Sequence, residues 1–163
     1  MRERCKSGNL GIEEALDLFD QMLDSNTKPS TYSFNILLTA VARMKHHNHT
    51  LLSLHNRMYR VGGVFLDNVT YGVFIISYNR INRVDHGFGV FGSMLKRGLN
   101  GDTLIFGSLM HGLCKQKRVA EAAQVLDKMP LSGCTPSVVS HNTLIKGLCS
   151  KGIRARHLSC LRN

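Results

Sequence analysis

The sequence repeats itself at a spacing of about 35 residues, and this periodicity constrains the fold more than any other feature. The tripeptide Gly-Leu-Cys ends at Cys114 and again at Cys149, 35 residues later. Met22, Met58 and Met94 are spaced by 36 residues. Four segments align on the same spacing: TYSFNILL (31–38), NVTYGVFI (68–75), TLIFGSLM (103–110) and VVSHNTLI (138–145). Several matches in one register indicate repeated units of a solenoid.

Each repeat contains two segments with the periodicity of an amphipathic α-helix. In the unit from residue 68, one apolar stripe has helical i, i+3, i+4, i+7 spacing: Tyr71, Phe74, Ile75 and Tyr78. A second stripe follows it: Val84, Phe88, Phe91 and Met94. A helix pair cannot bury both stripes by itself, so stacked neighbours must complete the core. We therefore predict an all-α solenoid with seven to nine helices and no sheet.

The repeat register divides the chain into complete and partial units. The complete units are 31–67, 68–102 and 103–137. Segment 4–30 is a partial repeat with a second helix only, and segment 138–152 is a partial repeat with a first helix only. Residues 153–163 form a basic tail without the repeat pattern. We therefore expect a truncated array that begins and ends within a repeat.

Charge and cysteine content limit the classes of partner. The formal net charge is +10, from 21 Lys and Arg against 11 Asp and Glu, which favours a polyanionic partner. No apolar run approaches the ~20 residues that span a bilayer, and the basic residues are too scattered for a membrane-surface helix. The five cysteines include no C-x-x-C pair, so neither a disulfide framework nor a zinc ribbon is indicated.

Several motifs then point to one family. The segments are VSHNTLIKGLC (139–149), HGLCK (111–115) and EEALDLFDQM (13–22). They resemble the pentatricopeptide repeat, whose units read roughly V-V-T-Y-N-T-L-I-x-G-L-C-K, then E-A-L-x-L-F-x-x-M, then G-x-x-P-D. The resemblance covers about residues 4–152 and is to the plain type, without an added catalytic domain. The tetratricopeptide repeat fits less well, because it has a period of 34 and a Trp signature, and this chain has no Trp.

The resemblance implies which residues would bind RNA. In that family one base is read per repeat by two side chains, the fifth residue of a unit and the last. The pairs here are Asn35 with Asp67, Gly72 with Asp102, and Gly107 with Ser137; the partners of Ser30 and Asn142 are missing. The second residue of each unit is expected to lie between bases: Tyr32, Val69, Leu104 and Val139. The Asn–Asp pair implies uracil, whereas the glycine units leave base preference open.

An alternative interpretation gives the same polar residues a structural role. Asn35, Asp67, Asp102 and Ser137 are residue types that cap helices and form turns. The sequence leaves both interpretations open.

The remaining motifs do not indicate a nucleotide-binding, metal-binding or catalytic site. GFGVFG (87–92) has the G-x-G-x-x-G pattern but falls where a helix interior is expected, without the preceding strand of a nucleotide site. His46, His47 and His49 have no nearby cysteine and are expected to be solvated between two helices. Cys114 and Cys149 are expected to be small buried residues at one repeat position. We predict no enzyme, no cofactor and no metal.

The resemblance implies an α-solenoid that binds single-stranded RNA and serves organellar transcript processing, stability or translation. The expected location is mitochondrial, with the chloroplast as the alternative, although no transit peptide is visible in this chain. Two other functions stay open. One is a protein-binding α-solenoid, which would lack the strong salt dependence of RNA binding. The other is a non-functional truncated fragment.

Overall fold

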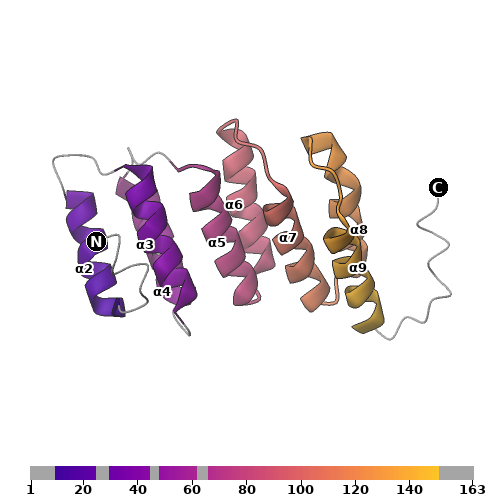
Figure 1. Cartoon of the computed structure of the whole chain (residues 1–163), viewed down its shortest axis with the longest axis horizontal. Helices are drawn as coiled ribbons and strands as arrows, with labels where there is room; N and C mark the ends of the chain where they lie inside the picture. Colours follow the sequence, from indigo (N-terminus) through magenta and orange to yellow (C-terminus); the bar gives the residue numbers. More distant parts are fainter. Residues whose placement is uncertain (1–9, 25–29, 45–47, 62–65, 151–163) are drawn as a thin grey trace.

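The computed structural model describes residues 10–24, 30–44, 48–61 and 66–150. This part of the chain forms eight α-helices and no strand, as the repeat pattern predicts (Figure 1). The helices are α2 (Ile12–Asp24), α3 (Thr31–Arg43), α4 (Asn48–Val61), α5 (Asn68–Arg80), α6 (Val84–Lys96), α7 (Thr103–Lys115), α8 (Val119–Lys128) and α9 (Val138–Ser150), with a 3-10 turn η1 (Pro130–Ser132) after α8.

The helices stack in two layers along the long axis of the molecule (Figure 1). Helices α3, α5, α7 and α9 pack side by side in sequence order and form the first layer. Helices α4, α6 and α8 form the second layer, and each packs against the first-layer helices that precede and follow it in the chain. Helix α2 packs on α3. Because every first helix lies beside the next one, residues at the same repeat position become spatial neighbours.

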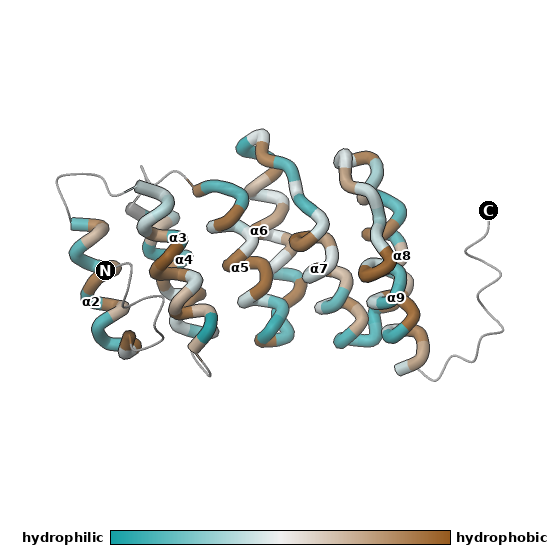
Figure 2. The backbone as a smooth tube through the Cα atoms, in the orientation of Figure 1, coloured by the Kyte–Doolittle hydropathy of each residue, from teal (hydrophilic) through white to brown (hydrophobic). Residues whose placement is uncertain are grey.

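The hydrophobic core runs along the whole stack instead of gathering at one centre. Figure 2 shows apolar segments on every helix, alternating with polar ones. Helix α5 packs against α3, α4, α6 and α7, and its aromatic residues Tyr71, Phe74 and Tyr78 are buried. Ala15 on α2 and Ala122 on α8 are fully buried, where a small side chain allows close helix approach.

The first-layer helices begin at side-chain caps. Ser30, Asp67 and Asp102 are the N-caps of α3, α5 and α7, and each accepts a hydrogen bond from a backbone N–H three residues later. Such bonds satisfy one of the donors that a helix leaves free at its first turn. Helices α6 and α8 begin at Arg83 and Arg118 without a side-chain cap bond. Capping therefore distinguishes α3, α5 and α7 from α6 and α8.

Two sequence expectations need correction. The segment from Lys45 to Thr50 was expected to join two helices, but α4 begins at Asn48, because neither proline nor glycine interrupts residues 48–50. His49 is therefore exposed on a helix, while residues 46 and 47 lie outside the described residues. The G-x-G-x-x-G segment lies within α6, as expected.

The two Gly-Leu-Cys cysteines differ, although equal burial was expected. Cys114 is buried, and its Sγ would lie 2.5 Å from a Cβ added to Gly147. Burial raises the pKa of the Cys114 thiol, which favours the protonated form. Cys149 is exposed, because no helix in the described part of the chain packs over that side of α9.

Candidate nucleic-acid interface

Four apolar side chains at the beginnings of the first-layer helices are exposed. Tyr32 on α3, Val69 on α5, Leu104 on α7 and Val139 on α9 have exposed fractions between 53% and 71%. Each is the second residue of its helix, and the four helices pack in succession. These residues, called here the apolar row, therefore lie at equivalent places along one edge of the stack. Their regular exposure along one edge makes this edge a candidate binding surface.

A row of capping residues lies beside the apolar row. Ser30, Asp67, Asp102 and Ser137 each precede the first residue of a first-layer helix. Asp67 accepts from the Thr70 N–H at 2.9 Å, and Asp102 accepts from the Ile105 N–H at 2.8 Å. Ser30 and Ser137 make longer bonds of 3.4 Å to the corresponding N–H groups. The structural interpretation of these polar residues as caps is thus correct for the positions that end each unit.

The fifth residues of the units differ in their surroundings. Asn35 is buried with an exposed fraction of 7%. Gly72 is buried, Gly107 is half-buried and Asn142 is exposed. Asn35 is covered by the beginning of α5, whereas no described helix follows α9 to cover Asn142. Asn35 lies in the second turn of α3 and caps no helix, so the capping interpretation is wrong for this residue.

Asn35, Asp67 and Thr70 form one hydrogen-bonded triad between α3 and α5. The Asn35 Nδ2 donates to both carboxylate oxygens of Asp67, at 3.0 and 2.9 Å. The Thr70 Oγ1 lies 2.5 Å from the Asn35 Oδ1 and 2.9 Å from the Asp67 Oδ1, and the nearer Asn35 Oδ1 is the main acceptor of its single hydrogen. The two residues that the family resemblance paired are therefore in direct contact, which fixes the orientation of the amide.

The triad also keeps Asp67 ionised. Partial burial acts to raise the pKa of the Asp67 carboxyl, but hydrogen bonds from the Thr70 N–H, the Asn35 amide, the Thr70 hydroxyl and the Val69 N–H oppose it. The balance lowers the pKa below its ordinary value of 3.8. At neutral pH the carboxylate is therefore an acceptor that carries a negative charge.

The glycine units keep the backbone arrangement but lack this polar contact. A Cβ added to Gly72 would lie 3.9 Å from the Ile105 Cγ1, so Gly72 faces Ile105 across α5 and α7 as Asn35 faces Thr70. A Cβ added to Gly107 would meet no atom within 4 Å. Ser137 lies near Ser140, whose side chain is buried, with Oγ atoms 3.4 Å apart. Both glycine positions have room for a Cβ.

Sequence reasoning did not identify Thr70. It is a polar residue with an exposed fraction of 0%, and the sequence signal available was a threonine three residues after a helix cap. That pattern is common at helix beginnings and does not by itself reveal a contact with the preceding helix.

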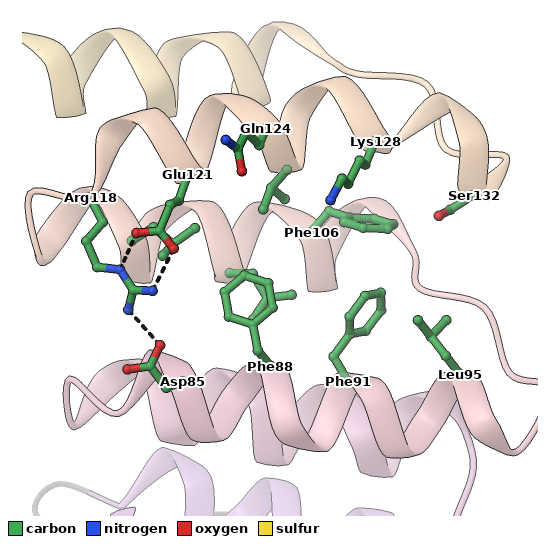
Figure 3. A pocket seen from close by; sticks show the side chains of 13 residues that line it. Asp85, Phe88, Phe91, Leu95, Phe106, Arg118, Glu121, Gln124, Lys128 and Ser132 are labelled. Carbon is green, nitrogen blue, oxygen red and sulfur yellow. Dashed lines mark hydrogen bonds and ion pairs between the residues drawn. The ribbon is translucent and has the colours of Figure 1, made fainter.

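A cavity of about 480 Å³ lies elsewhere, between α6, α7 and α8 (Figure 3). Phe88 and Phe91 point into it from α6, and Phe106 from α7. At one end Arg118 forms ion pairs of 2.6 Å with Asp85 and with Glu121. No residue of the apolar row, the capping row or the triad lines this cavity.

Two family models match this chain. The model of the PPR repeat family matches residues 1–43 and 101–150. A second model, the PPR repeat, matches residues 69–99. The chain belongs to the pentatricopeptide repeat family. Among the residues that the structure describes, no helix is long and apolar enough to cross a membrane.

Similar proteins include long members of this family. The chain is 38% identical over 138 residues to "Protein Rf1, mitochondrial" of Oryza sativa subsp. indica. This alignment covers 83% of this chain and 17% of that protein. It is 28% identical over 151 residues to the small ribosomal subunit protein mL103 (rPPR7) of Arabidopsis thaliana. This alignment covers 91% of this chain and 35% of that protein. The chain therefore spans a minor part of these pentatricopeptide relatives.

Solved structures share the fold. The PPR domain of Arabidopsis thaliana protein-only RNase P 1, solved in complex with tRNA, matches with a TM-score of 0.78 at 18% identity, covering 92% of this chain and 77% of that one. The maize pentatricopeptide repeat protein PPR10, solved with an 18-nt psaJ RNA element, matches with a TM-score of 0.67 at 24% identity, covering 94% of this chain and 23% of that one. These matches show that the chain has the fold of a pentatricopeptide repeat solenoid.

Proposed function

We propose that this pentatricopeptide chain binds single-stranded RNA along the edge formed by the apolar row and the capping row. The observation that carries the proposal is the coincidence of the two rows. An exposed apolar side chain stands beside a polar residue at the beginning of each of four adjacent helices. Apolar side chains suit stacking against bases, and the neighbouring polar groups suit a base edge. The RNA complexes of the two related solenoids support this assignment.

The base-reading positions in this proposal are the fifth and last residues of each unit. The units are 31–67, 68–102 and 103–137, with partial units 4–30 and 138–152, and the helix pairs of the structure support this division. The pairs are Asn35 with Asp67, Gly72 with Asp102, and Gly107 with Ser137, with Ser30 and Asn142 at the ends of the series. Only the first pair combines an amide with a carboxylate.

The triad favours uracil at the unit 31–67. The Asn35 Nδ2 carries two hydrogens, and an amide that donates one to Asp67 keeps the other for a base carbonyl. Uracil presents the O4 carbonyl at the position where cytosine presents an amino group, which would face a second donor. A purine is larger than the short reach of Asn35 allows. The preferred base is therefore a pyrimidine with a carbonyl at this edge.

The function proposed for the chain is binding without catalysis, in organellar transcript processing, stability or translation. The names of two relatives support an organellar location: Rf1 is called mitochondrial, and mL103 is named as a ribosomal subunit protein. We place the chain in the mitochondrion, with the chloroplast as the alternative.

The test compares U, C, A and G at one variable position of a single-stranded oligonucleotide, with the matching duplex as a control. Fluorescence anisotropy at fixed salt should show tighter binding to the single strand and to U. Asn35→Ala should remove the preference for U, an effect of ~1–3 kcal/mol by analogy with other side chain–base contacts. Absence of single-strand binding at low salt would reject the proposal. A uniform loss across the four bases would leave Asn35 as a structural residue.

A further inference from the structure

Thr70 is a buried hydroxyl placed between both members of the base-reading pair. Its side chain has no exposed surface, so it cannot touch RNA. It lies 2.5 Å from the Asn35 Oδ1 and 2.9 Å from the Asp67 Oδ1. Asp67 therefore holds the nitrogen end of the Asn35 amide, while Thr70 holds the oxygen end.

The two contacts together leave one orientation for the amide. An amide rotated by 180° would place its carbonyl oxygen against the Asp67 carboxylate, and two acceptors cannot form a hydrogen bond. Without the Thr70 hydroxyl, the Asn35 carbonyl would lose its buried donor, and an unpaired buried acceptor is unfavourable. Asp67 would then hold the amide at its nitrogen end alone, and the amide could tilt so that its remaining N–H no longer points at the base.

We propose that Thr70 is a specificity-determining positioning residue: its hydroxyl holds the oxygen end of the Asn35 amide, whose nitrogen end Asp67 already holds, so that the remaining N–H is aimed at the base. The inference rests on the proposed function and extends it from two residues to three. The third residue comes from the next unit, because Thr70, the third residue of α5, faces the fifth residue of the preceding first helix, as Ile105 of α7 faces Gly72.

At the neighbouring junction, between α5 and α7, both the third and the fifth residue are different. Asp102 caps α7 through the Ile105 N–H at 2.8 Å, just as Asp67 caps α5 through the Thr70 N–H at 2.9 Å. Ile105 then takes the place of Thr70, and Gly72 takes the place of Asn35, with 3.9 Å between the Ile105 Cγ1 and a Cβ added to Gly72. The amide at the α3–α5 junction thus meets a hydroxyl, and the glycine at the α5–α7 junction meets an apolar side chain, whereas the third residue of α9, after the unit with Gly107, is the buried Ser140.

The first experiment removes and restores the hydroxyl. Thr70→Val keeps the shape of the side chain without the hydroxyl, and Thr70→Ser keeps the hydroxyl. Affinities for U and C oligonucleotides are measured with thermal unfolding in parallel. Thr70→Val should reduce the U-over-C preference by about 2- to 10-fold, the range expected for one hydrogen bond, and Thr70→Ser should restore it. An unchanged preference in Thr70→Val would overturn the inference.

A double-mutant cycle tests whether Thr70 acts through Asn35. In an Asn35→Ala background the amide is absent, so Thr70→Val should change the U-over-C ratio no further. A purely structural role of Thr70 predicts a different result, in which affinity for all four bases falls equally with stability. A further change of the ratio in the Asn35→Ala background would contradict positioning through Asn35.

A transplant keeps the inference testable should Thr70→Val fail to fold. The unit 68–102 already contains Asp102, and a Cβ added at position 72 would make only an ordinary contact, 3.9 Å from the Ile105 Cγ1, a side chain that Ile105→Thr shortens. Gly72→Asn with Ile105→Thr reproduces the triad, and Gly72→Asn alone is its matched control. The double variant should prefer U over C at the adjacent nucleotide by about 2- to 10-fold more than the control. Equal preferences would overturn the inference.

The outcomes separate this inference from the proposed function. A wild-type chain that binds single strands without any base preference at this unit would refute base reading by Asn35 and Asp67, and the role of Thr70 with it. A wild-type chain that prefers U, and keeps that preference in Thr70→Val, would refute the role of Thr70 alone.

Discussion

Asp67 performs two structural tasks with one carboxylate. It caps α5 through the Thr70 N–H, and it holds the Asn35 amide of the preceding first-layer helix. The first contact stabilises the beginning of a helix, and the second joins two repeats. Changes at Asp67 should therefore affect the stability of the junction between α3 and α5 as well as RNA binding.

Acid should weaken this junction. The pKa of Asp67 lies below its ordinary 3.8 in the folded chain, so its stabilising contribution is fully present above that value and is lost as the pH falls through the folded pKa. The free energy of unfolding of the wild type should fall more steeply below about pH 4 than that of Asp67→Asn, which keeps a capping side chain but does not titrate. Chemical denaturation at several pH values measures both. Parallel curves for the two proteins would contradict the assignment.

At the residue scale, the base-reading pair was predictable from the family resemblance. The resemblance paired Asn35 with Asp67 across 32 residues, and the structure places them in contact. It missed Thr70, because a contact with the preceding helix depends on how α3 and α5 pack. It also could not distinguish the surroundings of Gly72 from those of Gly107, since both residues lack a side chain but have different neighbours.

The turns between paired helices show the repeat at the level of the backbone. Asn82 and Lys117, 35 residues apart, have φ angles of 60° and 62°. Each residue follows the end of a first-layer helix. After α5 the Arg83 N–H donates to the Tyr78 carbonyl, and after α7 the Arg118 N–H donates to the Leu113 carbonyl, both at 2.9 Å. Asn tolerates this left-handed conformation, whereas Lys has no such advantage.

Lys117→Gly should therefore stabilise the protein. Glycine adopts positive φ without steric cost, so a gain of about 1 kcal/mol in the free energy of unfolding is expected. Asn82→Gly is the matched control and should gain less, because Asn is already tolerated there. Urea denaturation of the two variants gives the comparison, and a larger gain at position 82 would contradict the explanation.

Glycines within helices divide into two kinds. A Cβ added to Gly89 on α6 would meet no atom within 4 Å, so Gly89→Ala should stabilise the helix by about 0.5–1 kcal/mol. A Cβ added to Gly147 on α9 would lie 2.5 Å from the Cys114 Sγ and 2.9 Å from the Cys114 Cβ. Gly147→Ala should force α7 and α9 apart and cost about 1–3 kcal/mol. Thermal melts should shift in opposite directions, and shifts of the same sign would argue against this packing.

The number and type of the elements followed from the sequence because both stripes of each repeat have helical periodicity. The exact beginning of α4 did not, since the histidine-rich segment before it contains no residue that stops a helix. The close contact of α7 with α9 at Cys114 and Gly147 was likewise visible only in three dimensions, although the Gly-Leu-Cys repetition marked both residues.

At the scale of the whole molecule, the charge of +10 predicts binding that is mainly electrostatic. Three complete units offer few bases to read, so phosphate contacts should supply most of the affinity. The logarithm of the association constant should fall with the logarithm of the salt concentration, by about 0.7 for each phosphate contacted. Asn35→Ala leaves the charge unchanged and should keep the same slope. A salt-independent affinity would instead favour a protein partner.

The capping row also limits how a solenoid of this kind can diversify. Ser30, Asp67, Asp102 and Ser137 are all residue types that begin helices well. A mutation that replaced one of them by an apolar residue would remove a cap, a loss of ~1 kcal/mol, before any new base preference could be selected. The last residue of each unit, one of the two proposed base-reading positions, is therefore restricted to the few amino acids that cap a helix. The fifth residue is free of that restriction.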